Sequence, residues 1–169
     1  MRLSKTLIVF FSLLTVHSAQ AESSSLFQHK ISDPVRQKEF SLKKKLILAG
    51  YDVVSYQQEG GPKKGVSQIQ TNYKGVTYYF LSEANKSEFS SDPQRYEPLY
   101  GGWCAYAMLD GSKTAVDPET FKIVDQRLLV FYNGVWGNTL ERWDKMLIDK
   151  VTDTALIKQA DEEWDDILR

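Results

Sequence analysis

The chain has 169 residues, of which 42% are hydrophobic and 25% are charged, and its formal net charge is −1. Because 21 Lys and Arg residues are balanced by 22 Asp and Glu residues, the composition gives no sign of the basic surface that nucleic-acid binding needs. The single cysteine excludes an internal disulfide, so stability is expected to come from packing, for which the chain supplies 8 Phe, 9 Tyr and 4 Trp residues.

The first 21 residues have the pattern of a cleavable secretory signal peptide. Arg2 and Lys5 precede an apolar run at residues 7–14, and the small residues Ala19 and Ala21 flank one spacer in an A-x-A cleavage site, with cleavage expected after Ala21. The apolar run is too short for a transmembrane anchor, which needs about 20 apolar residues. We therefore expect an exported protein, periplasmic or secreted, with no membrane span in its mature form. Loss of Arg2 and Lys5 would lower its net charge to −3.

Residues 22–45 are expected to form an N-terminal extension and residues 46–169 a single domain. In the extension, Asp33 and Pro34 predict the N-cap and the first position of a short helix. Two β-prone segments follow at residues 45–48 and 53–56, and turn residues predict a loop over 59–65.

The clearest local pattern is a hairpin followed by a helix. Residues 69–73 and 76–81 are β-prone and surround Lys74 and Gly75, which suit a tight turn. Ser82 predicts the N-cap of a helix over 83–89. Asp92 and Pro93 end that helix, and a further helical turn is expected over 93–96.

The C-terminal half predicts a second hairpin and two helices. Its strands are expected at 121–124 and 128–132, around a turn at 125–127. Asn138 and Thr139 predict the start of one helix, and Asp153 predicts the cap of the last one. Apolar residues recur at helical spacing in both helices, namely Leu140, Trp143 and Leu147, then Ile157, Ala160, Trp164 and Ile167. The expected fold class is α+β, with small antiparallel hairpins and packed helices.

Few residues carry recognisable catalytic chemistry. His29 is the one histidine beyond the predicted signal peptide, and with Cys104 it cannot supply the four ligands of a structural zinc site. A Cys–His nucleophilic pair lacks an evident orienting group, and no phosphate-binding, dinucleotide-binding or His-Glu-x-x-His motif is present. These patterns favour a protein that is not an enzyme.

Cys104 is the residue of greatest chemical interest. A thiol can bind Cu(I) or act in redox chemistry, and Met108, four residues further on, offers a thioether. A free cysteine is also often a small buried core residue, and Trp103, Ala105 and Ala107 favour burial. The preceding Gly101 and Gly102 allow backbone angles that other residues avoid.

Several motifs together resemble the exported, single-domain bacterial branch of the YHS-domain family. They are Gly-Tyr-Asp-Val-Val-Ser-Tyr at 50–56, Tyr-Lys-Gly-Val-Thr-Tyr-Tyr-Phe at 73–80 and Tyr-Gly-Gly-Trp-Cys-Ala-Tyr-Ala at 100–107. The likeness continues through residues 123–133 and covers about 46–164. It implies a compact α+β domain with a ββα core, like that of YHS and TRASH domains, and C-terminal helices.

The resemblance also bears on metal binding. Related YHS and TRASH-like domains, some attached to copper-transporting ATPases, are thought to bind metal through cysteines. Two of those cysteine positions correspond here to Leu81 and Asn85, so that metal chemistry does not carry over. Only Cys104 matches a cysteine of the exported branch, in its Tyr-Gly-Gly-x-Cys-Ala motif.

Three functional hypotheses remain open. The first is a non-enzymatic binding module for a small ligand or a soft metal ion such as copper near Cys104. Its tentative ligand-binding residues are Tyr51, Asp52, Tyr100, Gly101, Gly102 and Trp103, and its tentative metal ligands are Cys104 and Met108. The second is a structural or protein-interaction module with an inert buried cysteine. The third is a thiol-dependent redox protein, although no basic residue lies close to Cys104 in sequence.

Overall fold

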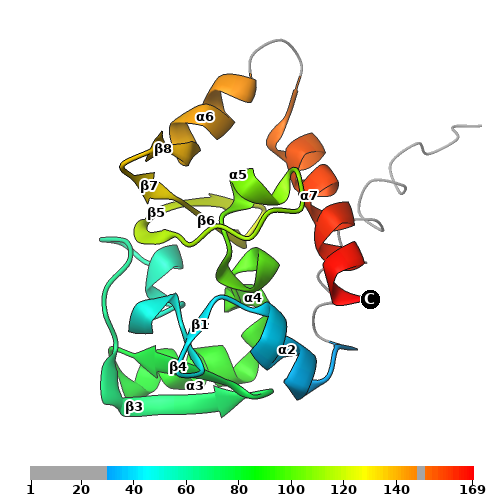
Figure 1. Ribbon diagram of the computed structural model, residues 1–169. Coiled ribbons are helices and arrows are strands. Elements are labelled where there is room, and N and C mark those ends of the chain that lie inside the picture. Colours follow the sequence, from blue (N-terminus) through cyan, green and yellow to red (C-terminus); the bar gives the residue numbers. More distant parts are fainter. Residues whose placement is uncertain (1–29, 148–150) are drawn as a thin grey trace, which may run out of the picture.

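The computed structural model describes residues 30–147 and 151–169 (Figure 1). The predicted signal peptide and His29 lie outside these residues, so export stays a prediction. Within the described ranges, no helix is both long enough and apolar enough to cross a membrane. The architecture is α+β, as predicted: a four-stranded mixed sheet, two further hairpins and six α-helices are found in the described part of the chain.

The N-terminal half is built around the four-stranded sheet. Helix α2 (Asp33–Glu39) precedes two short strands, β1 (Leu42–Lys43) and β2 (Leu46–Ile47). The predicted hairpin is confirmed as β3 (Val66–Tyr73) and β4 (Val76–Phe80). The strand order is β1-β2-β4-β3, in which only the β2–β4 pair is parallel. The N-terminal extension therefore contributes a strand to the same sheet as the hairpin.

The prediction of β-structure over 53–56 is wrong. The chain forms two single-turn 3₁₀ helices here, η1 (Leu48–Gly50) and η2 (Ser55–Gln57). Asp52 imposes this turn because its Oδ1 accepts the N–H of Val54 at 2.9 Å and its main-chain O accepts the N–H of Ser55 at 3.1 Å. Local side-chain hydrogen bonds of this kind compete with strand pairing.

Short helices follow the hairpin. Helix α3 (Glu83–Ser91) begins as predicted, with the Ser82 hydroxyl accepting the N–H of Asn85 at 3.1 Å. Helix α4 (Pro93–Tyr96) and the 3₁₀ helix η3 (Leu99–Gly102) lead to α5 (Ala105–Met108).

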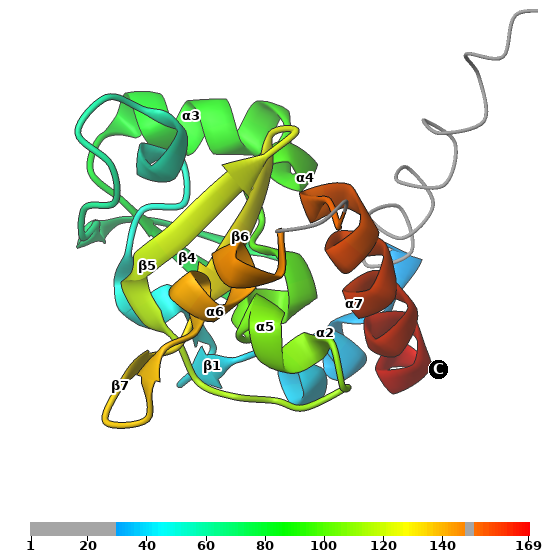
Figure 2. The same cartoon turned by 90° about the horizontal axis from the view of Figure 1, so that it is seen from above.

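The C-terminal half contains the second predicted hairpin, β5 (Asp117–Val124) with β6 (Arg127–Phe131). A smaller hairpin, β7 (Asn133–Gly134) with β8 (Gly137–Asn138), precedes α6 (Thr139–Met146) and α7 (Asp153–Leu168). Figure 2 shows α7 along one side of the molecule and the small hairpin projecting from the opposite side.

Two predicted caps are shifted by one residue. The N-cap of α2 is Ser32 and that of α7 is Thr152, whereas Asp33 and Asp153 are the first helical residues. Thr152 Oγ1 accepts the N–H of Ala155 at 3.2 Å, which leaves the Asp153 carboxylate free to accept a 2.7 Å bond from Trp143 Nε1. The prediction for α6 is confirmed, because Asn138 Oδ1 accepts the N–H of Leu140 at 2.9 Å.

One aromatic-rich core joins the two halves. Phe89 of α3 lies 4.5 Å from Tyr78 and 5.3 Å from Phe80, measured between ring centroids. On the other side, Trp164 of α7 approaches Phe40 at 6.0 Å and Tyr100 at 6.5 Å. The apolar face of α7 thus closes the core, as its helical spacing predicts.

The glycine pair after Tyr100 is required by backbone geometry and by close packing. Gly101 and Gly102 have φ values of +57° and +83°, and Tyr100 shares the left-handed region with a φ of +56°. A Cβ atom on Gly101 would lie 2.5 Å from Phe40 Cδ1 and 3.0 Å from its Cα. This segment therefore leaves no room for a side chain against α2.

We expect Gly101→Ala to lower the free energy of unfolding by about 3 kcal/mol, because backbone strain and overpacking add. Gly61→Ala is the matched control: Gly61 also has a positive φ (+67°), but the nearest atom to its Cβ would be 4.0 Å away. The control should lose only about 1 kcal/mol. Urea unfolding of both variants measures the difference, and equal losses would contradict the close-packing argument.

Candidate functional site

The predicted site residues come from two segments of the chain, one around η1 and η2 and the other from η3 to α5. Tyr51 and Asp52 lie in the loop between η1 and η2, whereas Tyr100 belongs to η3 and Cys104 immediately precedes α5. Each group has its own set of hydrogen-bond partners. The contacts of each group therefore differ.

Asp52 is fully buried and joins three segments of the chain. Its Oδ2 accepts the N–H of Leu81 at 2.8 Å and the side-chain amide of Asn85 at 2.7 Å, while its Oδ1 accepts the N–H of Val54. Its own N–H donates to Lys63 O at 2.9 Å. The carboxylate thus holds the loop before η2 against the end of β4 and the start of α3.

Tyr51 faces the second hairpin. Its hydroxyl donates to Glu119 Oε1 at 2.7 Å, and Lys64 Nζ lies 5.6 Å from its ring centroid. The hydrogen bond to Glu119 raises the pKa of Tyr51, with a smaller contribution from burial. This exposed hydrogen bond between Tyr51 and Glu119 links the two halves of the molecule.

Cys104 is 0% exposed and lies between β6 and the start of α6. Its Sγ accepts the N–H of Tyr132 at 3.4 Å and lies 3.3 Å from Thr139 Oγ1. Thr139 donates its only hydroxyl proton to Tyr132 O at 2.8 Å. The S–H of Cys104 must therefore be the donor toward Thr139, and the sulfur both donates and accepts within the fold. Met108 is also buried, one turn further along.

The aromatic residues of the predicted set serve the core. Tyr100 is buried, its hydroxyl lies 3.4 Å from Ile157 O, and burial, followed by the charge of Asp161, raises its pKa well above the ordinary value. Trp103 Nε1 donates to Glu39 O at 2.7 Å. Both side chains tie η3 to flanking helices, Tyr100 to α7 and Trp103 to α2.

The β3–β4 hairpin, its tight turn, helix α3 and the helical turn α4 follow one another along residues 66–96. Residues 60–100 match the YHS domain. The match spans this ββα unit, and it excludes Tyr51, Asp52, Cys104 and Met108. No curated protein and no solved structure shows significant similarity to the chain. Assignment to the exported single-domain branch stays a proposal.

The described residues contain no group of three or more His, Cys, Asp or Glu side chains arranged to hold a metal ion. At the two YHS positions where the resemblance places cysteines, Leu81 and Asn85 offer a main-chain N–H and a side-chain amide to Asp52. The residues present there do not fit a soft metal ion, which prefers thiolates and thioethers.

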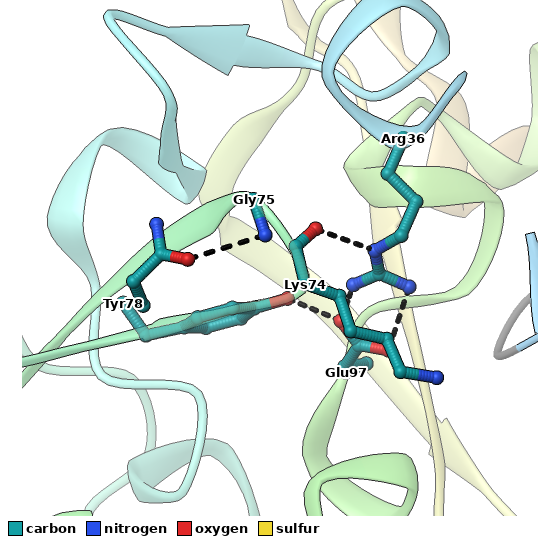
Figure 3. A network of polar contacts seen from close by, with 6 residues as sticks. Arg36, Lys74, Gly75, Tyr78 and Glu97 are labelled. Atoms are coloured by element: carbon teal, nitrogen blue, oxygen red, sulfur yellow. Dashed lines mark hydrogen bonds and ion pairs between the residues drawn. The ribbon is translucent and has the colours of Figure 1, made fainter. Parts of the chain in front are cut away.

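A buried ionic network that the sequence analysis missed anchors the YHS domain to α2 (Figure 3). Arg36 comes from α2, whereas Tyr78 and Glu97 belong to the YHS segment. The guanidinium pairs with the Glu97 carboxylate, with side-chain exposures of 0% and 1%, and the Tyr78 hydroxyl donates to the same carboxylate. Arg36 Nε also donates to Lys74 O, at the hairpin turn, at 3.2 Å.

The electrostatics of this network favour ionised Arg36 and neutral Tyr78. Burial alone would lower the pKa of Arg36, but the Glu97 carboxylate outweighs it and the net shift is upward. Burial, followed by the negative charge of Glu97, raises the pKa of Tyr78 well above its ordinary value. Glu97 therefore accepts from two donors whose protons are held firmly. Nothing in the local sequence around Glu97 predicts this role.

The C-terminal helix is tied to β6 by a partly buried ion pair. Arg127 donates through one terminal nitrogen to both oxygens of Asp161, at 2.9 and 3.1 Å. One turn further, Asp165 Oδ1 is buried, as is Arg127 Nε, and neither atom has a hydrogen-bond partner among residues 30–147 and 151–169. Burial, followed by the charge of Asp161, raises the pKa of Asp165.

We expect Glu97→Gln to lower the free energy of unfolding by about 3 kcal/mol or more, because it removes the carboxylate that faces a buried guanidinium. The double variant Arg36→Met, Glu97→Gln should recover a large part of that loss, since neither charge is then buried. Denaturant unfolding of the two single variants and the double variant measures the coupling. Additive losses would contradict the network.

We expect Asp165 to make stability depend on pH. Because its pKa is raised in the folded state, its contribution is fully present below the ordinary pKa of an aspartate and is lost as the pH rises through the folded value. Asp165→Asn should therefore be more stable than the parent at neutral pH, and the gain should disappear in acid. Thermal unfolding across this pH range tests it. Exposed Asp166, paired with Arg169 at 2.7 Å, is the control, and Asp166→Asn should show no such gain.

Proposed function

We propose that the chain is a non-enzymatic, exported YHS-domain module in which Cys104 is an inert core residue and interactions are made through the outer surface. The observation that carries this proposal is the closed set of hydrogen bonds around the Cys104 thiol. It favours the second of the three hypotheses drawn from the sequence.

A metal-binding or redox role would need a different state of the sulfur. Cu(I) and disulfide partners react with the thiolate, which has lost the S–H proton. Here that proton is directed to Thr139, and a sulfur lone pair accepts the N–H of Tyr132. Binding a metal would therefore break both contacts inside the core and leave the Tyr132 N–H without its acceptor.

Asp52 supports the same proposal from within the ββα unit. In the metal-binding relatives that the sequence resembles, the end of the second strand and the first turn of the helix are thought to be joined through cysteine ligands. Here the Asp52 carboxylate joins the same two places by accepting from Leu81 and Asn85. The Asp52 carboxylate thus connects the end of β4 to the first turn of α3 by hydrogen bonds, and the domain folds without a metal.

Apart from Tyr51, the remaining tentative site residues also lie in or against the core. Tyr100, Gly101, Gly102 and Met108 are buried, and Trp103 is half-buried with its indole N–H bonded to Glu39 O. A ligand would have to displace packed side chains to reach them. This supports a binding role for the exterior in place of a ligand site formed by these residues.

We expect the Cys104 thiol to react with a thiol reagent only when the protein unfolds, so that its rate in the native protein is at least about 100-fold below its rate in denaturant. Ser67→Cys, in the exposed first part of β3, is the control and should react rapidly in the native state. Rapid modification of Cys104 would favour the redox hypothesis.

Anaerobic titration with Cu(I) completes the test. The parent chain and Cys104→Ser should bind the same number of ions with the same affinity if Cys104 is not a ligand. The substitution keeps a small side chain that hydrogen-bonds, which limits disturbance of the core. Loss of a bound ion in Cys104→Ser, or in Met108→Leu, would overturn the proposal in favour of a metal site.

A further inference from the structure

The small β7–β8 hairpin presents two large apolar side chains to solvent. Val135 is 91% exposed and Trp136 is 77% exposed, far more than any other large apolar residue in the described part of the chain. Both occupy the two-residue tip between Gly134 and Gly137. The hairpin projects from the body of the molecule, opposite α7 (Figure 2).

Hydrogen bonds with Tyr132 and Arg142 hold the backbone of the tip. Trp136 N–H donates to the Tyr132 hydroxyl at 3.2 Å, and the Arg142 guanidinium donates to Trp136 O. The Tyr132 ring packs so closely that a Cβ on Gly134 would lie 2.6 Å from its hydroxyl oxygen. A contact made by the two exposed side chains would therefore cost little backbone ordering.

Folding alone does not explain these two residues. Gly, Asn, Asp and Ser dominate hairpin tips because they satisfy the backbone of the turn. Val135 and Trp136 have no such use, and their side chains remain largely outside the core. Large apolar groups held in water at a projecting point are typical of a surface that is covered when it works.

We propose that the Val135–Trp136 tip inserts into the headgroup region of a phospholipid membrane. Trp is enriched at membrane interfaces, where its ring lies among headgroups and its N–H keeps a polar partner. The Arg142 guanidinium touches the tip backbone and can meet a lipid phosphate. Residues 128–140 contain no Asp or Glu, so the tip itself carries no charge that would repel an anionic surface.

Size and shape favour a lipid surface over a protein partner. A stable protein interface buries about 800 Å² on each side and needs a complementary shape. Two side chains at a convex tip fall well short of that area, and Met146 and Val66, which are also exposed, belong to α6 and β3. A bilayer accepts a narrow apolar projection without a preformed pocket. A single such projection gives weak and reversible attachment. The inference is independent of the state of Cys104.

The test uses Trp136 as its own probe. The full chain and its Trp136→Phe variant are mixed with vesicles of equal phosphatidylglycerol and phosphatidylethanolamine, and their difference spectrum isolates Trp136, since the other three tryptophans are present in both. We expect a blue shift of this emission and quenching by lipids brominated near the headgroup. Val135→Ser should raise the lipid concentration for half-quenching about threefold or more, because it removes apolar area from the tip.

Matched variants separate the alternatives. Arg142→Gln should weaken quenching, whereas Lys145→Gln, which removes an exposed cation from the same helix, should leave it unchanged. Circular dichroism checks that each variant is folded, and residues 1–29 are the same in all of them. Absence of a shift and of quenching, or an unchanged lipid dependence in Val135→Ser, would overturn the proposal. A blue shift without vesicles that grows with protein concentration would do the same, because a second copy of the chain would then cover the tip.

Discussion

A buried guanidinium needs a carboxylate beside it to compensate its charge. The Arg36–Glu97 pair therefore sets how the N-terminal part of the chain lies on the YHS domain. The two residues are 61 positions apart, and both side chains are buried. Relative to apolar packing, such a pair contributes little net stability, but any other arrangement leaves a charge uncompensated at a cost of about 3–5 kcal/mol. The pair therefore selects one position for α2, and the Tyr78 hydroxyl and Lys74 O also hydrogen-bond within this network.

That fixed position of α2 has consequences across the core. Phe40, directly after α2, contacts both the Arg36 guanidinium, 4.5 Å from its ring centroid, and the ring of Trp164. Gly101 must lack a side chain because Phe40 fills the space beside it. Gly101 of the Tyr-Gly-Gly-x-Cys motif is thus required by the residue that ends α2, whereas a Cβ atom on Gly102 would lie 3.1 Å from Ile47 Cδ1. On the other side, Arg127 and Asp161 fix α7 in a comparable way.

The sequence predicts what is determined locally. The β3–β4 turn at Lys74 and Gly75 and the caps of α3 and α6 are confirmed, because a turn residue or a capping side chain acts within three or four positions. The prediction of β-structure over 53–56 is wrong because the Asp52 carboxylate, from a neighbouring position, overrides the strand propensity of these residues. Contacts such as Asp52 with Asn85 join residues 33 positions apart, and no pattern in either segment announces them.

The candidate site was harder to predict than the fold for a physical reason. Glycines, tyrosines and a cysteine in one motif are the residue types of a ligand pocket and equally those of a tightly packed core. Only the hydrogen-bond partners distinguish the two, and those partners, Thr139 and Tyr132 for Cys104, come from a distant part of the chain. The Val135-Trp136 pair between two glycines stands in the sequence, but its exposure to solvent cannot be predicted from composition.

The interior thiol and the exposed tip are linked by the same two residues. Tyr132 and Thr139 flank the β7–β8 hairpin, one on each side, and both hydrogen-bond to Cys104 Sγ. Thr139 also closes the base of the hairpin by donating its N–H and its hydroxyl to Tyr132 O, at 2.9 and 2.8 Å. The Cys104 sulfur accepts the N–H of Tyr132 and donates its S–H toward Thr139. It therefore joins the residues that flank the hairpin within the buried core. The buried Cys104 thus contacts both residues at the base of the hairpin and ties that base to the core.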